Sequence, residues 1–144
     1  MKRRNACKTL QATFPLLLAC LMCLWQPAYA VGSDVAKEQR WADQIVDSLM
    51  DGDELWLNDG SGHEFLGLMT EAEEESTNAI VLLHGIGVHP NWPEVIYPLR
   101  VGLPESNWAT LSIQMPILKN EAEGKEYVPL FPEVSARILS LIHI

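Results

Sequence analysis

A histidine and two glycines that directly follow a strongly apolar run are the residues of this chain best placed for chemistry. The run Ala79–Leu83 contains β-branched residues and leads into His84, Gly85, Ile86 and Gly87. Such a run, with glycines at its end, predicts a strand buried on both faces, as in the parallel sheet of an α/β protein. The following loop lies at the carboxyl edge of the sheet, where these folds bind ligands, and glycine there lets backbone N–H groups approach a substrate.

An amphipathic helix is predicted ahead of this strand, over residues 34–50. Ser33 or Asp34 can cap its first turn. Its apolar positions fall on one helical face and are Trp41, Ile45, Val46, Leu49 and Met50. We expect this face to pack against the rest of the domain.

A hairpin is predicted between the helix and the buried strand. The segments 54–57 and 63–69 are rich in apolar residues, and the turn-forming cluster Asn58–Gly62 separates them. The acidic segment 71–78 that follows has no apolar anchor and is interpreted as a solvated loop.

The residues after His84 predict a βαβ unit. A short helix is expected over 94–101, with Asn91 as its cap and Pro93 near its first turn. Residues 109–114 alternate apolar and polar, as a strand does. A strand, a helical crossover and a second strand build a parallel pair. A charged loop is predicted over 119–127, and a second helix begins over 132–138.

The first 30 residues have the layout of a secretory signal peptide. Lys2, Arg3, Arg4 and Lys8 precede a mostly apolar segment, and a small-x-small cleavage site ends at Ala30. The apolar stretch is short for a bilayer span, so no stable membrane insertion is expected after cleavage. A lipoprotein site at Cys20 is a weaker alternative, since it would leave an apolar segment directly after the lipidated residue. The protein is therefore expected in the periplasm or secreted.

Removal of residues 1–30 changes the composition of the chain. All three cysteines go, which excludes disulfides, thiol nucleophiles and thiolate metal sites in the mature protein. Four of the ten basic residues go with them and none of the 19 acidic ones, so the net charge falls from −9 to −13. This charge argues against nucleic acid as a partner.

The last residues, Leu139–Ile144, read as one in-frame translation of a transposase adapter used in DNA library preparation. We interpret them as sequencing debris on a truncated reading frame; the alternative is the ordinary end of an amphipathic helix. Genomic DNA that encodes this same tail without interruption would contradict the adapter interpretation.

Several of these motifs carry a resemblance to a known family. Ile80–Gly87 and Trp108–Pro116 look like the amino-terminal half of an α/β-hydrolase. Trp41–Ile45 and His84–Pro93 resemble an uncharacterised, exported bacterial family, domain of unknown function 3530, which is placed among the α/β-hydrolases. The resemblance extends from Trp41 to Ile138. It implies a truncated α/β-hydrolase-type sheet, in which residues 31–138 form the amino-terminal part of one domain.

The resemblance also implies roles for the loop after the first parallel strand. In α/β-hydrolases the residue after His-Gly commonly gives a backbone N–H to the oxyanion hole, which here is Ile86, with Gly85 shaping the turn. His84 would brace the loop and not act as the base, because the base of the superfamily comes late in the chain. No Gly-x-Ser-x-Gly occurs in these residues, so the nucleophile, acid and base would lie beyond Ile138.

The other polar candidates favour structural roles. Ser61 lies between glycines in a predicted turn, and Ser112 lies inside a predicted strand. His84 and His89 together could bind a metal only with a third ligand that the sequence does not supply, so no metal and no cofactor are expected. Two functions stay open: a serine hydrolase acting on a small ester or other acyl substrate, and a non-catalytic α/β-hydrolase-like binding protein of the cell envelope. This chain by itself is expected to be inactive.

The first prediction concerns export. The mature protein should begin at Val31, because the basic start, the apolar segment and the small-x-small site occur in that order. Amino-terminal sequencing of protein from the envelope fraction checks this. A chain that still begins at Met1, or that carries lipid on Cys20, would refute it.

Overall fold

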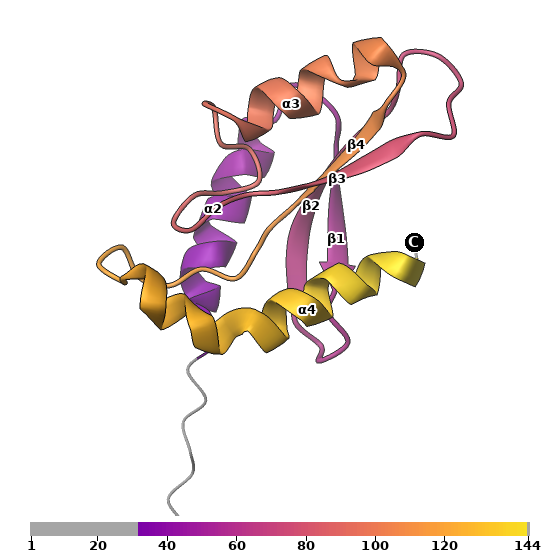
Figure 1. The fold of residues 1–144 in the computed structure, drawn as a ribbon. Helices are drawn as coiled ribbons and strands as arrows, with labels where there is room; N and C mark the ends of the chain where they lie inside the picture. The colour runs from indigo at the N-terminus through magenta and orange to yellow at the C-terminus, as the bar shows by residue number, and fades with distance from the viewer. Residues whose placement is uncertain (1–31, 144) are drawn as a thin grey trace, which may run out of the picture. The chain divides into compact units, whose positions relative to one another are not determined.

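The computed structural model describes residues 32–143, so the predicted signal peptide lies outside the described residues. Four strands form one mixed sheet in the order β1-β2-β4-β3, and three α-helices pack around it (Figure 1). The strands are β1 (Asp53–Asn58), β2 (Glu64–Thr70), β3 (Ala79–Leu83) and β4 (Ala109–Ile113). The helices are α2 (Val35–Asp47), α3 (Ile96–Gly102) and α4 (Phe131–Ser140). The predicted mixed α/β class is confirmed.

The predicted hairpin is confirmed as the antiparallel pair β1–β2. Gly60 and Gly62 in its turn have φ values of 87° and 95°, a region that L side chains rarely adopt. Ser61 lies between them and is exposed. The glycines therefore explain why the chain reverses here and returns in register from Asn58 to Glu64.

The predicted βαβ unit is also confirmed, since β3 and β4 pair in parallel and α3 lies between them in sequence. The paired positions run from Ala79 opposite Ala109 to Leu83 opposite Ile113. Both strands therefore end at the same edge of the sheet. The loops that follow Leu83 and Ile113 must begin side by side.

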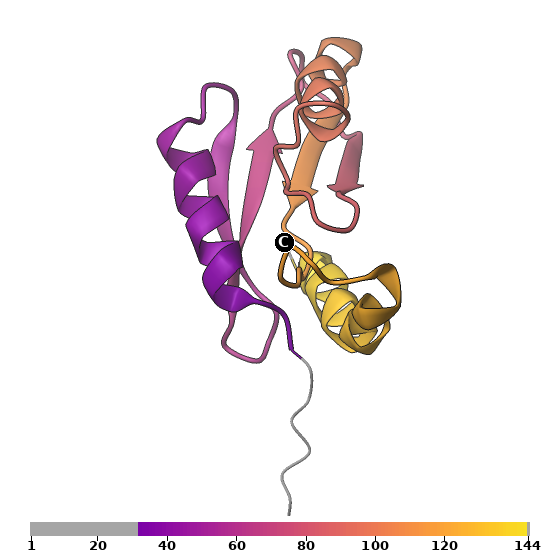
Figure 2. The same cartoon turned by 90° about the vertical axis from the view of Figure 1, so that its left-hand side faces the viewer.

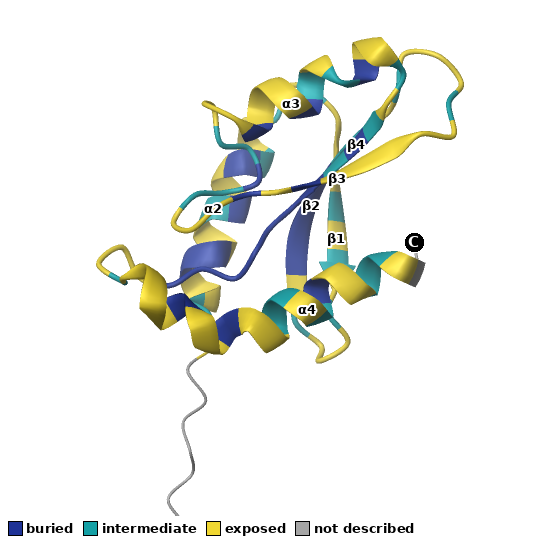
Figure 3. Ribbon diagram, viewed as in Figure 1, coloured by how far each residue is buried: buried dark blue, intermediate teal, exposed yellow. Residues whose placement is uncertain are grey.

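The prediction that β3 is buried on both faces is wrong for the described part of the chain. Only Leu82 is buried, whereas Val81 and Leu83 are each 45% exposed (Figure 3). The physical reason is position: within residues 32–143, β3 is an edge strand of the sheet and pairs only with β4. An apolar run indicates that a strand can be buried, but the position of the strand in the sheet decides how much of it is covered.

The start of α3 also differs from the prediction. The helix begins at Ile96, and Val95 stands at its N-cap without a side-chain hydrogen bond. Asn91 does not cap it; its Oδ1 instead accepts a hydrogen bond of 3.1 Å from Nη2 of Arg100. Arg100 is fully buried, so its guanidinium needs such acceptors, and the carbonyl of Asp51 supplies another at 2.6 Å.

Helix α2 packs on one face of the sheet, against β2. The Asp34 side chain caps it by accepting the Lys37 N–H at 3.0 Å, as predicted. Its apolar stripe packs on β2, where the buried cluster consists of Ala42, Ile45, Leu66 and Leu68. The helix ends at Asp47, three residues short of the predicted limit, so Met50 leaves the helical face and is 93% exposed.

Helix α4 packs on the opposite face of the same hairpin (Figure 2). Phe65 points toward it, because successive side chains of a strand alternate between the two faces and Leu66 faces α2. Ile113, Met115 and the partly buried Val134 of α4 join Phe65 in this second cluster. The helix continues past Ile138 to Ser140, which leaves both interpretations of the tail open.

A buried ion pair joins the helices of the two faces around the end of β4. Nη2 of Arg137 on α4 lies 2.8 Å from Oε2 of Glu38 on α2, and both side chains are almost fully buried. Nη1 of Arg137 donates to the carbonyl of Gln114 at 2.9 Å. Oε1 of Glu38 accepts the N–H of Ile117 at 3.1 Å. The pair therefore holds both helices to the segment that follows β4.

The second prediction tests this pair. Arg137→Met should destabilise the mature protein by about 3–5 kcal/mol, because it leaves the Glu38 carboxylate buried without its cation. The double variant Glu38→Leu/Arg137→Met should recover most of that loss, since neither member of the pair is then left buried without its partner. Urea unfolding of both variants measures the difference. Strictly additive effects of the two single changes would contradict the coupling.

Candidate functional site

The candidate site lies where β3 and β4 end together. The loop His84–Gly87 leaves β3, and the segment Gln114–Pro116 leaves β4 at the same edge of the sheet. Gly87 has a φ of 74°, so the loop turns through a backbone conformation that favours glycine. The carboxyl edge of parallel strands is the usual ligand-binding edge of α/β folds.

His84 ties these two segments together. Its side chain is buried; Nδ1 donates to the carbonyl of Gly85 at 2.9 Å, and Nε2 accepts the N–H of Met115 at 3.0 Å. One neutral tautomer satisfies both bonds. Burial lowers the pKa of His84 to about 4, although the hydrogen bond to Gly85 opposes this shift. With both ring nitrogens in use, His84 is placed to hold the loop and has no free nitrogen to take a proton from a substrate.

The backbone of Ile86 faces away from these internal bonds. Within residues 32–143 its N–H donates no hydrogen bond to the protein, and its side chain is 60% exposed. A free, positioned amide is the group that an oxyanion hole requires. Gly85 beside it has open space where a Cβ would stand.

A cleft of about 250 Å³ opens beside this loop. Leu83 and Ile86 line one side of it, and Met115 and Pro116 come from the segment after β4. Phe131 and Val134 of α4 close the remaining side. No Lys, Arg, Asp or Glu side chain lines this cleft in the described part of the chain.

The far wall of the cleft is a structure that the sequence patterns did not predict. Residues 119–127 were expected to be a charged loop, but a 3₁₀ helix spans Gly124–Leu130 and contributes Tyr127 and Leu130 to the cleft. Its signal is present in the sequence as a capping box, in which Glu123 and Glu126 bond each other's backbone.

The two candidate serines have structural roles. Ser61 donates its hydroxyl to Oδ1 of Asp59 at 2.6 Å, within the exposed hairpin turn. Ser112 is fully buried and donates to the carbonyl of Pro90 at 2.7 Å. The structure brings neither hydroxyl into hydrogen-bond contact with a histidine.

His89 has a packing role that differs from the role of His84. The His89 ring packs edge-on between Trp41 and Trp92, with centroid distances of 5.6 and 5.4 Å. Its Nδ1 accepts the N–H of Asn91 at 3.2 Å, so this nitrogen is occupied. Across residues 32–143 no three His, Cys, Asp or Glu side chains are grouped closely enough to hold a metal ion.

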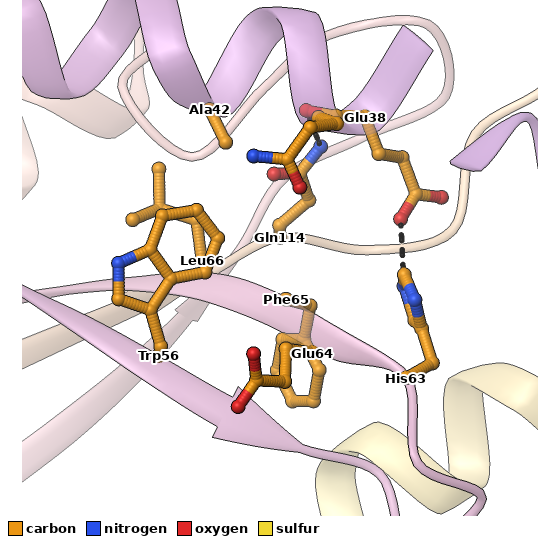
Figure 4. Close-up of a pocket in the computed structure, with 9 residues that line it drawn as sticks. Glu38, Ala42, Trp56, His63, Glu64, Phe65, Leu66 and Gln114 are labelled. Carbon is orange, nitrogen blue, oxygen red and sulfur yellow. Dashed lines mark hydrogen bonds and ion pairs between the residues drawn. The ribbon is translucent and has the colours of Figure 1, made fainter. Parts of the chain in front are cut away.

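A second, smaller hollow lies between α2 and the hairpin (Figure 4). Glu38, Gln114 and His63 line it, and Nε2 of His63 lies 3.3 Å from Oε2 of Glu38. Its volume is about 10 Å³, which is no more than a single water requires. We therefore assign these polar groups to the packing of α2.

Comparison with known proteins defines the family. Residues 24–136 match the family described as "Protein of unknown function (DUF3530)", and the chain belongs to it. No curated protein and no solved structure matches the chain. In residues 32–143 we also find no helix with the length and apolar character that crossing a membrane would require.

The third prediction follows from the buried His84. Its pKa is about 4 in the folded state and about 6.5 when exposed, so the unfolded state binds more protons between these values. Stability should therefore fall as the pH drops from 6.5 toward 4. At about pH 4.5 protonation of this histidine on unfolding should lower the free energy of unfolding by roughly 2–3 kcal/mol.

Urea unfolding at pH 7 and at about pH 4.5 measures this loss. His84→Gln is the matched control, because an amide can still accept from Met115 and donate to Gly85 without titrating. Between pH 7 and about pH 4.5 the free energy of unfolding of the variant should fall by about 2–3 kcal/mol less than that of the wild type. Equal losses in both proteins would show that His84 does not titrate on unfolding.

Proposed function

We propose that this chain is the amino-terminal part of an exported serine hydrolase that acts on an ester or other acyl substrate. In this proposal the nucleophile, acid and base lie beyond residue 138, and Ile86 supplies the first oxyanion donor. The observation that carries it is the free N–H of Ile86 at an apolar cleft, on a loop that His84 holds in place.

The chemistry requires a donor that is fixed before the reaction begins. Attack on an acyl carbon moves negative charge onto the carbonyl oxygen, and a preorganised N–H stabilises that charge without reorganising. His84 restrains the Gly85 carbonyl from one side and the Met115 N–H from the other. The peptide that follows Gly85 carries the Ile86 N–H, so its direction depends on the same restraint.

Export belongs to the same proposal. The basic, apolar and small-residue segments of residues 1–30 would direct the chain across the cytoplasmic membrane, after which cleavage releases it into the periplasm or the medium. The strongly acidic mature chain contains no cysteine, which suits a soluble hydrolase that needs no disulfide.

A non-catalytic binding protein of the cell envelope is the second candidate. The observation that favours it is the apolar cleft, which could hold a ligand without a nucleophile. The two candidates differ in one feature of the full reading frame. A hydrolase has Gly-x-Ser-x-Gly after a later strand, followed by an acid and a histidine, whereas a binding protein has no need of them.

The fourth prediction tests the oxyanion loop in the full-length protein. Gly85→Pro should abolish labelling by a fluorophosphonate serine probe. Proline removes the N–H of residue 85 itself and changes the path of the loop, which moves the N–H of Ile86 out of place. Loss of one oxyanion donor alone typically lowers turnover by about 10²–10³. Circular dichroism should stay close to that of the wild type.

Gly85→Ala is the matched control. Nothing lies within 4 Å of the Cβ that it adds, and the alanine keeps its N–H, so labelling should persist. Labelling of Gly85→Pro at the wild-type rate would contradict the assignment of the loop. If the wild-type full-length protein reacts with no such probe, the hydrolase proposal fails and the binding-protein candidate replaces it.

A further inference from the structure

We propose that the cleft beside the His84–Gly87 loop receives the acyl part of an uncharged ester with a short apolar chain. This inference rests on the proposed function and adds the substrate class to it. It starts from the walls of the cleft, which are contributed by segments far apart in the sequence. Leu83 and Phe131, both on the lining, are 45% and 60% exposed and so present apolar surface to a ligand.

The polar groups of the cleft are committed to the fold. Both nitrogens of His84 are hydrogen-bonded within the protein. Tyr127 accepts the N–H of Leu118 with its hydroxyl oxygen, at 3.1 Å. Within residues 32–143 the main-chain N–H groups of Gly85 and Ile86 donate no hydrogen bond to the protein, and both residues line the cleft. Main-chain donors beside apolar walls match a ligand with a carbonyl and an apolar chain.

The charge of the ligand follows from the same lining. No cationic side chain lines the cleft in the described residues, so a carboxylate that entered it would lose its hydration without gaining a partner. The chain as a whole carries a net charge of −9, which repels anions further. An ester or a similar neutral acyl compound has neither penalty.

The size of the cleft limits the length of the ligand's acyl chain. Its volume of about 250 Å³ lies just below the range of about 300–1,000 Å³ that is typical of sites for drug-sized ligands. A short acyl chain fits such a space, whereas a long one would exceed it. Phe131, at the first position of α4, is a lining side chain that is 60% exposed and can be changed without opening the core.

The test uses the mature full-length protein and butyl butyrate as the probe, with binding followed through the amide resonances of the loop. The ester should shift the resonances of Gly85 and Ile86, whereas sodium butyrate at the same concentration should not. Butyl decanoate, which has the same alcohol and a longer acyl chain, should bind no more tightly. Phe131→Asp, which places a carboxylate on the wall, should weaken ester binding at least tenfold.

Val128→Asp is the matched control, because Val128 is 56% exposed, close to the 60% of Phe131, but does not line the cleft. It should bind the ester like the wild type. Equal binding of butyrate, tighter binding of the decanoate, or no shift with any probe would overturn the proposal. So would a concentration-dependent dimer that Phe131→Asp dissociates and the ester does not, since the cleft would then be an interface between copies.

The outcome is separable from that of the proposed function. Ester binding without fluorophosphonate labelling would support the acyl cleft and refute the serine hydrolase. Labelling without ester binding at the loop would refute the cleft and leave the hydrolase intact.

Discussion

The buried pair of Glu38 and Arg137 is the constraint on which the candidate site depends. It reaches around the end of β4 and bonds the main chain there at two points, the carbonyl of Gln114 and the N–H of Ile117. Between them lies Met115, whose N–H is held by His84. A charge pair between two helices is thus linked, through one short segment, to the loop that carries Ile86.

Such a pair is costly to bury, and it is stable only when its remaining polar atoms find partners. Here Glu133 adds a second carboxylate to Arg137 at 2.6 Å, and His63 approaches Glu38 from the hairpin at 3.3 Å, whereas Nε of Arg137 has no hydrogen-bond partner within residues 32–143. These partners come from α4 and from the residue just before β2. The network therefore links α2, α4 and the hairpin through polar contacts, in addition to the apolar clusters that pack them.

The site itself combines a rigid polar frame with uncovered apolar surface. Both ring nitrogens of His84 are hydrogen-bonded, which restrains the loop, while Leu83 and Ile86 beside it stay exposed. Preorganised donors next to apolar walls are what acyl chemistry requires of a protein. The same exposure continues along the edge strand β3, so the apolar run Ala79–Leu83 contributes to the surface as well as to the core.

What the sequence determined by itself was local. Glycines with positive φ set the hairpin turn, Asp34 set the start of α2, and apolar periodicity placed β3, β4 and the helix between them, because each of these signals acts within a few residues. Tertiary structure decided the rest. Asn91 bonds Arg100 instead of capping α3, β3 lies at an edge of the sheet, and His84 bonds the N–H of Met115. Each of these outcomes depends on a residue or strand elsewhere in the chain, so no local pattern encodes it.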